Sequence, residues 1–252
     1  MRLIDLATHS GGLPREVPRD ESPATDPFQT ITTDAFAAWL SENPLNFPPG
    51  TSIAYSNFGF DLLSWALSTA AGDSYSELLR KRITGPLGME DTAFVPSDDM
   101  VVRLMTGHAR NGAPLPMVPT GDVVTGSGGL YSTANDLLRW MRWHLDDSAP
   151  GVVARFLGHG IFVQRDGMEM VVSMDESGRM DAMGLGWVAM NATDKQPFYL
   201  QKSGALQGQM SYIAFAPHHD VAVFATMNQF DFATAEGLTA AANELLASLS
   251  GF

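Results

Sequence analysis

The apolar pattern of the chain changes at about residue 160 from helical spacing to short β-rich segments, and this change constrains the fold most. Residues 160–227 contain segments rich in β-branched and aromatic residues, separated by turn residues. These segments are GIFVQR, MEMVVSM, GLGWVAM, FYLQK, QMSYIAFAP and DVAVFATMN. Their length and spacing are typical of an antiparallel meander. A closing helix is predicted over FATAEGLTAAANELLASL, residues 232–249.

The chain before the meander is predicted to be mainly helical over residues 57–146. The stretch FDLLSWALSTAA has apolar residues at helical spacing, and Gly72 follows it where a helix ends on glycine. Residues 15–50 are rich in Pro, Asp, Ser and Thr and are predicted to be ordered loop, with one or two helical turns around TTDAFAAWLSEN. Helices followed by hairpins predict an α+β fold in a single domain over residues 1–252. Its antiparallel strands and closing helix would occupy residues 160–252.

Composition excludes several classes of partner and cofactor. The 15 basic and 28 acidic residues give a net charge of -13, which argues against nucleic acid and anionic membranes as partners. The absence of cysteine excludes disulfides, thiolate zinc sites and a cysteine nucleophile. The histidines lack metal-ligand spacing, so neither a metal nor another cofactor is predicted. No apolar run is long enough for a membrane span, and MRLIDLATHSGG does not match a signal peptide.

Two short polar stretches have the residue types of an active site. PGTSIAYSNFGF places Tyr55 and Asn57 between a Pro-Gly turn and the start of a helix. The strand-like run FYLQKSGALQG carries Lys202, Ser203 and Gly204. Each stretch alone has a structural interpretation: Asn57 as a helix N-cap, or Lys202 as an edge-strand charge with Gly204 at a bulge. Together they match, in order, the second and third elements of the Ser-x-x-Lys, Ser-Asp-Asn and Lys-Thr-Gly set of serine hydrolases.

On several stretches the sequence resembles the penicillin-binding-protein and class C β-lactamase-like serine hydrolases. LATHSGGLP, PPGTSIAYSNFGFDLLSWAL, RITGPLGMEDTAF, GSGGLYSTANDLLRWM and QKSGALQG are similar to family segments in the same order. THSGGLPRE, GSGGLYST, GLGWVAM and LQKSG look most similar to the periplasmic D-alanyl-D-alanine carboxypeptidase/endopeptidase branch. The resemblance implies a β-lactamase/transpeptidase-like fold and a periplasmic location. His9, in LATHSGGLP, is predicted to be a structural hydrogen-bonding histidine, because the family uses no histidine there as a base.

The resemblance also implies roles for individual residues. Tyr55 would relay a proton between nucleophile and leaving group, and Lys202 would favour its phenolate and attract a substrate carboxylate. Asn57 would bind the substrate's side-chain amide. Ser203 would donate to the substrate carboxylate, and the N–H of Ala205 would form half of the oxyanion hole. Glycine between these two strand residues would leave room for a ligand, so the predicted substrate-binding set is Asn57, Ser203, Gly204 and Ala205.

One element of the family pattern is absent. A Ser-x-x-Lys motif needs a serine three positions before a lysine, and those positions hold Leu78, Ala192 and Tyr199. In the family this motif precedes the region that LATHSGGLP resembles. We therefore expect an N-terminally truncated chain that lacks the first strands and the nucleophile helix, whether as a fragment, through a mis-called start, or as one piece of a split protein.

The resemblance favours a serine-type acyl-transfer hydrolase that cleaves D-Ala-D-Ala-type peptide bonds of peptidoglycan through an acyl-enzyme. Esterase or β-lactamase action on small ester or β-lactam substrates in the same fold is one alternative. A non-catalytic protein that binds D-Ala peptides or a protein partner is another. The intact Tyr55, Asn57 and Lys202 favour an enzyme, whereas the absent Ser-x-x-Lys motif favours the non-catalytic alternative for this chain alone.

Truncation also leads to a structural expectation. In the family the strand that matches DVAVFATMN is central and pairs with the first strand of the missing segment. Here it is predicted to be an edge strand, and such edges expose unpaired N–H and C=O groups. The helix over residues 232–249 would lose apolar cover as well. We therefore expect a homodimer, aggregation, or binding of a separate N-terminal segment.

Overall fold

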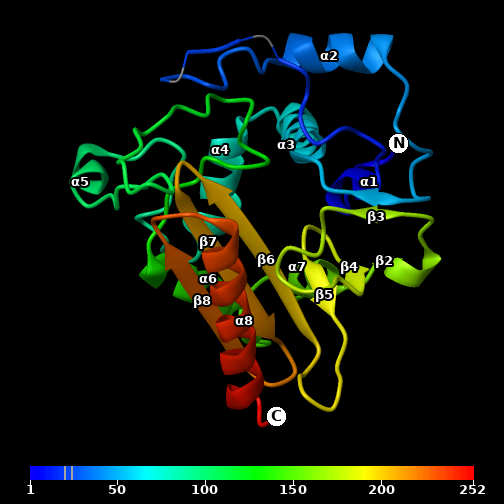
Figure 1. Ribbon diagram of the computed structural model, residues 1–252, viewed down its shortest axis with the longest axis vertical. Helices are drawn as coiled ribbons and strands as arrows, with labels where there is room; N and C mark the ends of the chain where they lie inside the picture. The colour runs from blue at the N-terminus through cyan, green and yellow to red at the C-terminus, as the bar shows by residue number, and fades with distance from the viewer. Residues whose placement is uncertain (20, 24) are drawn as a thin grey trace. The chain divides into compact units, whose positions relative to one another are not determined.

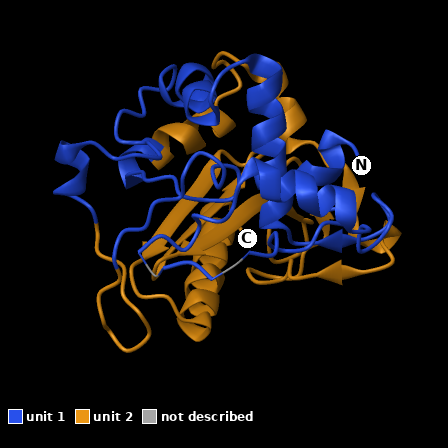
Figure 2. Ribbon diagram, turned by 90° about the horizontal axis from the view of Figure 1, so that it is seen from above, with its two compact units in different colours: residues 1–104, 116–136 blue, residues 105–115, 137–252 orange. Residues whose placement is uncertain are grey.

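The computed structural model divides the chain into two compact units (Figure 2). It describes residues 1–19, 21–23 and 25–252. Unit 1 consists of residues 1–104 and 116–136, and unit 2 of residues 105–115 and 137–252. The expectation of one domain over residues 1–252 stays a prediction.

Unit 1 consists mainly of helices and loops (Figure 1). Its elements are α1 (Leu3–Ala7), α2 (Thr33–Glu42), β1 (Ile53–Ala54), α3 (Asn57–Ala71), α4 (Tyr75–Leu79), the π-helical turn η1 (Arg80–Thr84) and α5 (Asp98–Val101). The helix α6 (Ala134–Leu145) begins at the end of this unit and continues into unit 2. The predicted helical segment around TTDAFAAWLSEN is α2, and FDLLSWALSTAA lies within α3.

The helix α3 begins and ends where its terminal residues allow. Ser56 is the N-cap and its Oγ accepts a hydrogen bond from the Gly59 N–H at 2.8 Å. Gly72 ends the helix at φ 69°, and its N–H donates to the Ser68 carbonyl at 2.9 Å. The predicted glycine end is therefore confirmed, because this left-handed conformation costs glycine little.

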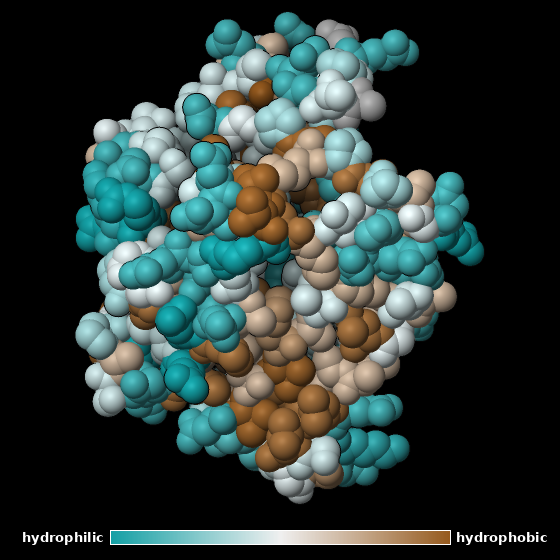
Figure 3. All heavy atoms as spheres, turned by 90° about the vertical axis from the view of Figure 1, so that its left-hand side faces the viewer, coloured by the Kyte–Doolittle hydropathy of each residue, from teal (hydrophilic) through white to brown (hydrophobic). Residues whose placement is uncertain are grey.

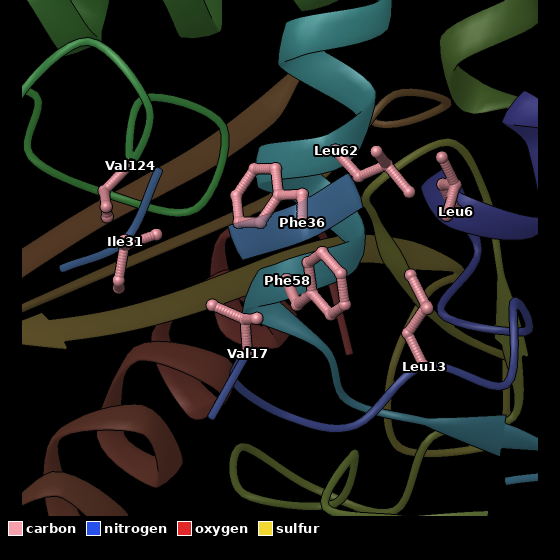
Figure 4. Packing of buried hydrophobic residues seen from close by; sticks show 8 residues of the cluster. All are labelled: Leu6, Leu13, Val17, Ile31, Phe36, Phe58, Leu62 and Val124. Carbon is pink, nitrogen blue, oxygen red and sulfur yellow. The ribbon is translucent and has the colours of Figure 1, made fainter. Parts of the chain in front are cut away.

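One hydrophobic cluster fixes α3 within unit 1 (Figure 4). Its buried members come from α1, α2, α3 and two loops: Leu6, Leu13, Val17, Ile31, Phe36, Phe58, Leu62 and Val124. The rings of Phe36 and Phe58 have centroids 4.9 Å apart. Burial of such a side chain contributes about 1.5–3 kcal/mol. The cluster therefore holds the start of α3 against the loops that carry Leu13 and Val124.

Unit 2 is built on an antiparallel sheet with the strand order β2-β4-β5-β6-β7-β8. Its strands are β2 (Val163–Gln164), β4 (Ala182–Met183), β5 (Val188–Met190), β6 (Tyr199–Leu206), β7 (Gln209–Ala216) and β8 (Val221–Met227). The other elements are α7 (Val152–His159), the 3₁₀ turn η2 (Arg165–Gly167), β3 (Val171–Val172) and α8 (Phe232–Leu249). Residues 199–227 confirm the predicted meander, whereas the earlier segments form strands of only two or three residues. The closing helix is confirmed over its full predicted length.

The helix α8 packs on the two last strands of the sheet (Figure 1). Tyr212 of β7 is buried, and its hydroxyl donates to the Asn243 side chain of α8. The turn between β6 and β7 consists of Gln207 and Gly208, both with positive φ, as a two-residue hairpin requires. Within the described chain, no helix is both long and apolar enough to cross a membrane.

The strand β8 ends the sheet. In the described part of the chain it pairs with β7 alone, from Val221 opposite Ala216 to Met227 opposite Met210. The prediction of an edge strand is therefore confirmed. Figure 3 shows the side of the molecule on which β8 lies in Figure 1, and hydrophobic residues gather in the lower half of that face.

Candidate active site

The structure places Tyr55 and Asn57 at the junction between β1 and α3, as the sequence predicts. The N-cap of α3 is Ser56, so the interpretation of Asn57 as the cap is wrong. Ser and Asn are both preferred caps, and the local backbone decides between them. Because Ser56 satisfies the helix end, the Asn57 side chain makes another contact. Its Nδ2 donates to Oε1 of Glu16 at 2.6 Å.

The segment of residues 14–16 lies beside the start of α3 and holds it. The Arg15 carbonyl accepts from the N–H groups of Asn57 and Phe58 at 2.8 and 3.2 Å. Ser56 Oγ donates to the Pro14 carbonyl at 2.6 Å. These contacts satisfy backbone donors of the first helical turn, which lack partners within the helix. Loop and helix start therefore form one hydrogen-bonded piece.

Tyr55 contacts a cation and an imidazole of its own unit. The guanidinium carbon of Arg15 is 4.7 Å from the centroid of the Tyr55 ring, within the range of a cation–π contact. The ring of His9 lies 4.7 Å from it, centroid to centroid. Sequence reasoning missed Arg15 and Glu16, although both stand in the THSGGLPRE stretch that resembles the family. The two residues directly follow LATHSGGLP.

His9 is a structural residue, as predicted. It is buried, and its Nδ1 accepts a hydrogen bond from the Ser56 N–H at 3.1 Å. A ring nitrogen that accepts carries no proton, so the proton of the neutral ring lies on Nε2. The His9 ring also packs on Phe60 at 4.7 Å between centroids. His9 therefore fixes the position of Tyr55 in two ways: its ring packs on the Tyr55 ring, and its Nδ1 binds the backbone N–H of the next residue, Ser56.

Asp61, one helical turn after Asn57, is a buried acid that sequence reasoning also missed. It is 2% exposed, and both carboxylate oxygens accept from Ser127: Oδ1 from the N–H at 2.9 Å and Oδ2 from Oγ at 3.0 Å. Burial raises the pKa of Asp61 to about 7, although these hydrogen bonds act in the opposite direction. The negative charge of Glu16 raises this pKa further.

In unit 2 the strand β6 carries the other predicted residues consecutively. Lys202 and Ser203 are partly buried, and Gly204 and Ala205 are exposed. Each pairs one-to-one with β7, ending with Ala205 opposite Met210, so the interpretation of Gly204 as a bulge is wrong. A Cβ atom at Gly204 would have no heavy atom within 4 Å among its described surroundings. Open space therefore lies beside the glycine.

From Ser203 onward, the edge of β6 that faces β5 is not paired with another strand of the described chain. The neighbouring strand β5 pairs only with residues 199–201 of β6. From Ser203 onward, β7 is the one strand that pairs with β6 in the described chain. Main-chain N–H and C=O groups on the β5 side can therefore bind an extended ligand, as strand addition does in peptide recognition. The N–H of Ala205, the predicted oxyanion donor, lies in this stretch.

Two histidines that show no motif in the sequence lie together in unit 2. His144 Nδ1 is 2.8 Å from His159 Nε2. Burial lowers the pKa of His144 to about 3, so the pair is neutral near pH 7. The described residues contain no group of three or more potential His, Asp or Glu metal ligands. The pair packs among Trp187 and Phe215 as part of the core.

Comparisons with known proteins give consistent matches. A family model described as Beta-lactamase matches residues 1–247. The D-alanyl-D-alanine-carboxypeptidase/endopeptidase AmpH of Escherichia coli (strain K12) is 36% identical over 254 residues, which cover 99% of this chain and 64% of that protein. Penicillin-binding protein 4 of Amycolatopsis lactamdurans is 30% identical over 215 residues, or 81% of this chain and 54% of its own length. The chain thus spans less than two thirds of these curated relatives.

Solved structures give the same result for the fold. A beta-lactamase/D-alanine carboxypeptidase from Yersinia pestis, complexed with citrate, has a TM-score of 0.87 and 36% identity, covering 98% of this chain and 69% of that one. A class C beta-lactamase matches with a TM-score of 0.77 at 19% identity, over 99% of this chain and 70% of that one. The second match concerns the fold alone. Together they confirm the predicted β-lactamase/transpeptidase-like α+β fold.

Proposed function

The chain belongs to the beta-lactamase family, and we propose that it supplies the proton relay and the substrate-binding residues of a serine-type acyl-transfer hydrolase. Its substrate is a D-Ala-D-Ala-type peptide of peptidoglycan. The observation that carries this proposal is the edge of β6 from Ser203 onward, which β5 does not pair with, together with the open space beside Gly204. An extended peptide fits such an edge, and a lysine and a hydroxyl stand beside it.

The nucleophile comes from a Ser-x-x-Lys segment outside these 252 residues, because no serine stands three positions before a lysine. Its oxygen bonds to the carbonyl carbon of the penultimate D-Ala while its proton moves to the Tyr55 oxygen. The C–N bond then breaks, and Tyr55 gives the proton to the leaving D-Ala nitrogen. Water attacks the ester in the same way and regenerates the serine.

The other residues bind the peptide and stabilise charge. The N–H of Ala205 donates to the developing oxyanion, and such a donor is typically worth roughly 100- to 1,000-fold in kcat. Lys202 and Ser203 attract and bind the terminal carboxylate of the peptide. Asn57, oriented by Glu16, binds an amide of the substrate. The reaction needs no metal or other cofactor.

We assign the protein to the periplasm, where peptidoglycan is found. The partner that the mechanism requires is the segment that carries Ser-x-x-Lys, in the same or in a separate chain. The edge of β8 and the exposed apolar side chains of α8, such as Leu245 and Leu249 at 50% and 60%, offer it a surface. A second copy of this chain is the competing occupant of that edge.

The decisive experiment begins with the genomic DNA immediately upstream of Met1. We expect an in-frame Ser-x-x-Lys segment, and a chain that includes it should form a covalent adduct with labelled penicillin and release D-Ala from a D-Ala-D-Ala peptide. The 252-residue chain should form no adduct by intact-mass spectrometry. Turnover of an ester or of a β-lactam in place of the peptide would assign esterase or β-lactamase action instead.

One observation favours a second function for the chain alone. Without Ser-x-x-Lys it has no nucleophile of the family type, yet it retains Tyr55, Asn57 and Lys202. Such a chain would bind D-Ala peptides without cleaving them. Isothermal titration with a D-Ala-D-Ala peptide and with its L-Ala-L-Ala counterpart distinguishes specific binding from none.

A further inference from the structure

The glycine-rich loop of residues 124–129 lies directly on α3, beside the turn that carries Asn57. Val124 belongs to the same hydrophobic cluster as Phe58 and Leu62 of α3 (Figure 4). A Cβ atom at Gly126 would lie 2.0 Å from the Phe60 carbonyl oxygen, so only glycine fits there. Loop and helix therefore touch along main-chain atoms, and the next residue, Ser127, is the one bound by Asp61.

Asp61 and Asn57 face the same side of α3, because residues four apart on a helix are neighbours. Glu16 links them. It accepts the hydrogen bond of the Asn57 amide at 2.6 Å, and its negative charge acts on Asp61. Asp61 in turn faces the Gly126 N–H and the N–H and hydroxyl of Ser127 from the loop. Glu16, in the segment of residues 14–16 that packs on the start of α3, is the titratable neighbour whose charge acts on Asp61.

Keeping an ionised carboxylate at this buried position opposes folding. Loss of hydration is the largest influence on Asp61, and its hydrogen bonds offset only part of it. A buried group that is costly to ionise and lies close to substrate-binding residues points to a role other than stability. Ionised, it makes charge-assisted hydrogen bonds to Ser127, which are about twice as strong as neutral ones.

We propose that Asp61 is a positioning residue: its ionised carboxylate holds residues 126–127 on α3 beside Asn57, and protonation weakens this hold. As a consequence, pH should change the stability of the local contact and the stability of the whole fold in opposite directions. Raising the pH through neutrality ionises Asp61 and tightens the local contact, while it lowers the global stability of the fold. A residue that served only packing would move both in the same direction. We use the proposed function only to name Asn57 as a substrate contact.

Amide hydrogen exchange in the 252-residue chain tests the hold directly. Protection of the Gly126 and Ser127 amides, corrected for intrinsic exchange, is measured between about pH 5.5 and pH 8.5. In the parent chain it should rise by roughly tenfold, with its midpoint near neutrality. Asp61→Asn should abolish this rise, and Ser127→Ala should reduce it, because the N–H contact remains.

Two further variants separate this role from a general effect of buried acids. Asp136→Asn removes another buried carboxylate of unit 1, which accepts from the Asp91 N–H and the Thr92 hydroxyl, and should leave the rise unchanged. Glu16→Gln removes the like charge and should move the midpoint to lower pH. This variant keeps the test valid if Asp61→Asn fails to fold. A flat profile in the parent chain, an unchanged profile in Asp61→Asn, or loss of the rise in Asp136→Asn would overturn the proposal.

A binding measurement separates this proposal from the proposed function. Affinity for a D-Ala-D-Ala peptide should increase with pH over the same range in the parent chain and stay constant in Asp61→Asn. If no peptide binds at any pH while the exchange profile is as expected, the proposed function fails and the role of Asp61 stands. If the peptide binds and the exchange profile is flat, the proposed function stands and the role of Asp61 fails.

Discussion

The side-chain amide of Asn57 donates a hydrogen bond to the carboxylate of Glu16 at 2.6 Å. One of its two N–H groups is thereby occupied, and the plane of the amide is fixed. The remaining N–H and the carbonyl oxygen then point in defined directions, so they can bind a substrate amide through its acceptor and its donor. Glu16 thus sets the orientation of the residue that the family resemblance assigns to substrate binding.

Replacing Glu16 should weaken substrate binding in proportion to the loss of this acceptor. Glu16→Ala removes it, and we expect affinity for a D-Ala-D-Ala peptide to fall by roughly 10- to 100-fold, since a hydrogen bond to a charged group is worth about 1.5–3 kcal/mol. Glu16→Gln keeps an acceptor oxygen and should lose less than half of that free energy. Equal losses in both variants, by isothermal titration, would show that orientation is not the cause.

Tyr55→Phe should lower turnover far more than binding. In a chain that includes the Ser-x-x-Lys segment, removal of a proton relay should reduce kcat by roughly 100- to 10,000-fold with little change in KM. Lys202→Ala should impair both, because the cation acts on the bound carboxylate and on the transition state. Tyr75→Phe, a tyrosine next to Phe94, serves as the control. Near-full turnover of Tyr55→Phe would refute the relay.

The contribution of Asp61 should lower the free energy of unfolding as pH rises from about 4 to about 7. Its folded pKa of about 7 lies above the ordinary value of 3.8, so the folded state binds more protons in that window. The free-energy cost of keeping Asp61 ionised in the folded state is fully present above pH 7 and absent below both pKa values. Three pKa units correspond to at most about 4 kcal/mol. Asp61→Asn should therefore raise the Tm at about pH 8 and not at about pH 4. If the Tm difference between this variant and the parent chain were the same at both pH values, the raised pKa of Asp61 would be contradicted.

Replacement by alanine should have opposite effects on fold stability and on peptide binding at two glycines. Gly204→Ala adds a methyl group to open space, so the Tm should change little while peptide binding is lost. Gly126→Ala places its Cβ against the Phe60 carbonyl and should destabilise the fold by several kcal/mol, about the size of the larger single-mutant effects. Thermal unfolding and peptide titration on both variants check this. Full peptide binding by Gly204→Ala would show that no ligand lies against β6 there.

The free edge of β8 should make the isolated chain associate. We expect concentration-dependent mass in light scattering and weak amide protection over residues 220–227 on dilution. Thr226→Lys, at an exposed position of β8, should reduce association because lysine blunts an edge. Ala70→Lys adds the same charge at an exposed position of α3 and should not. A monomer with well-protected β8 amides would show that the edge is covered from within the chain.

The sequence predicts those parts of this protein that depend on local patterns. The end of α3 at Gly72 and the full span of α8 follow from residue types in one stretch, and so do the strands β6 to β8. The site residues Tyr55, Asn57 and Lys202 were found because each stands in a short motif with a fixed order.

What the sequence does not predict depends on contacts between distant segments. Glu16 and Asn57 are 41 positions apart, and Asp61 and Ser127 are 66 apart, without any periodic signal that joins them. The choice of Ser56 over Asn57 as cap also escapes prediction, because both residue types suit the position. The roles of Arg15, Glu16 and Asp61 therefore depend on contacts that exist only in the folded chain.

The strand β5 stops pairing with β6 after residue 201, and this has an evolutionary consequence. Donors and acceptors along residues 203–206 belong to the main chain, so only proline can delete an N–H and no substitution deletes a carbonyl, whereas many substitutions delete a side-chain contact. Selection for a new substrate, or for escape from an inhibitor that lies along this edge, must act through the path of the strand or through neighbouring loops. Inhibitors whose contacts are confined to these backbone atoms should therefore face few single-residue routes to resistance.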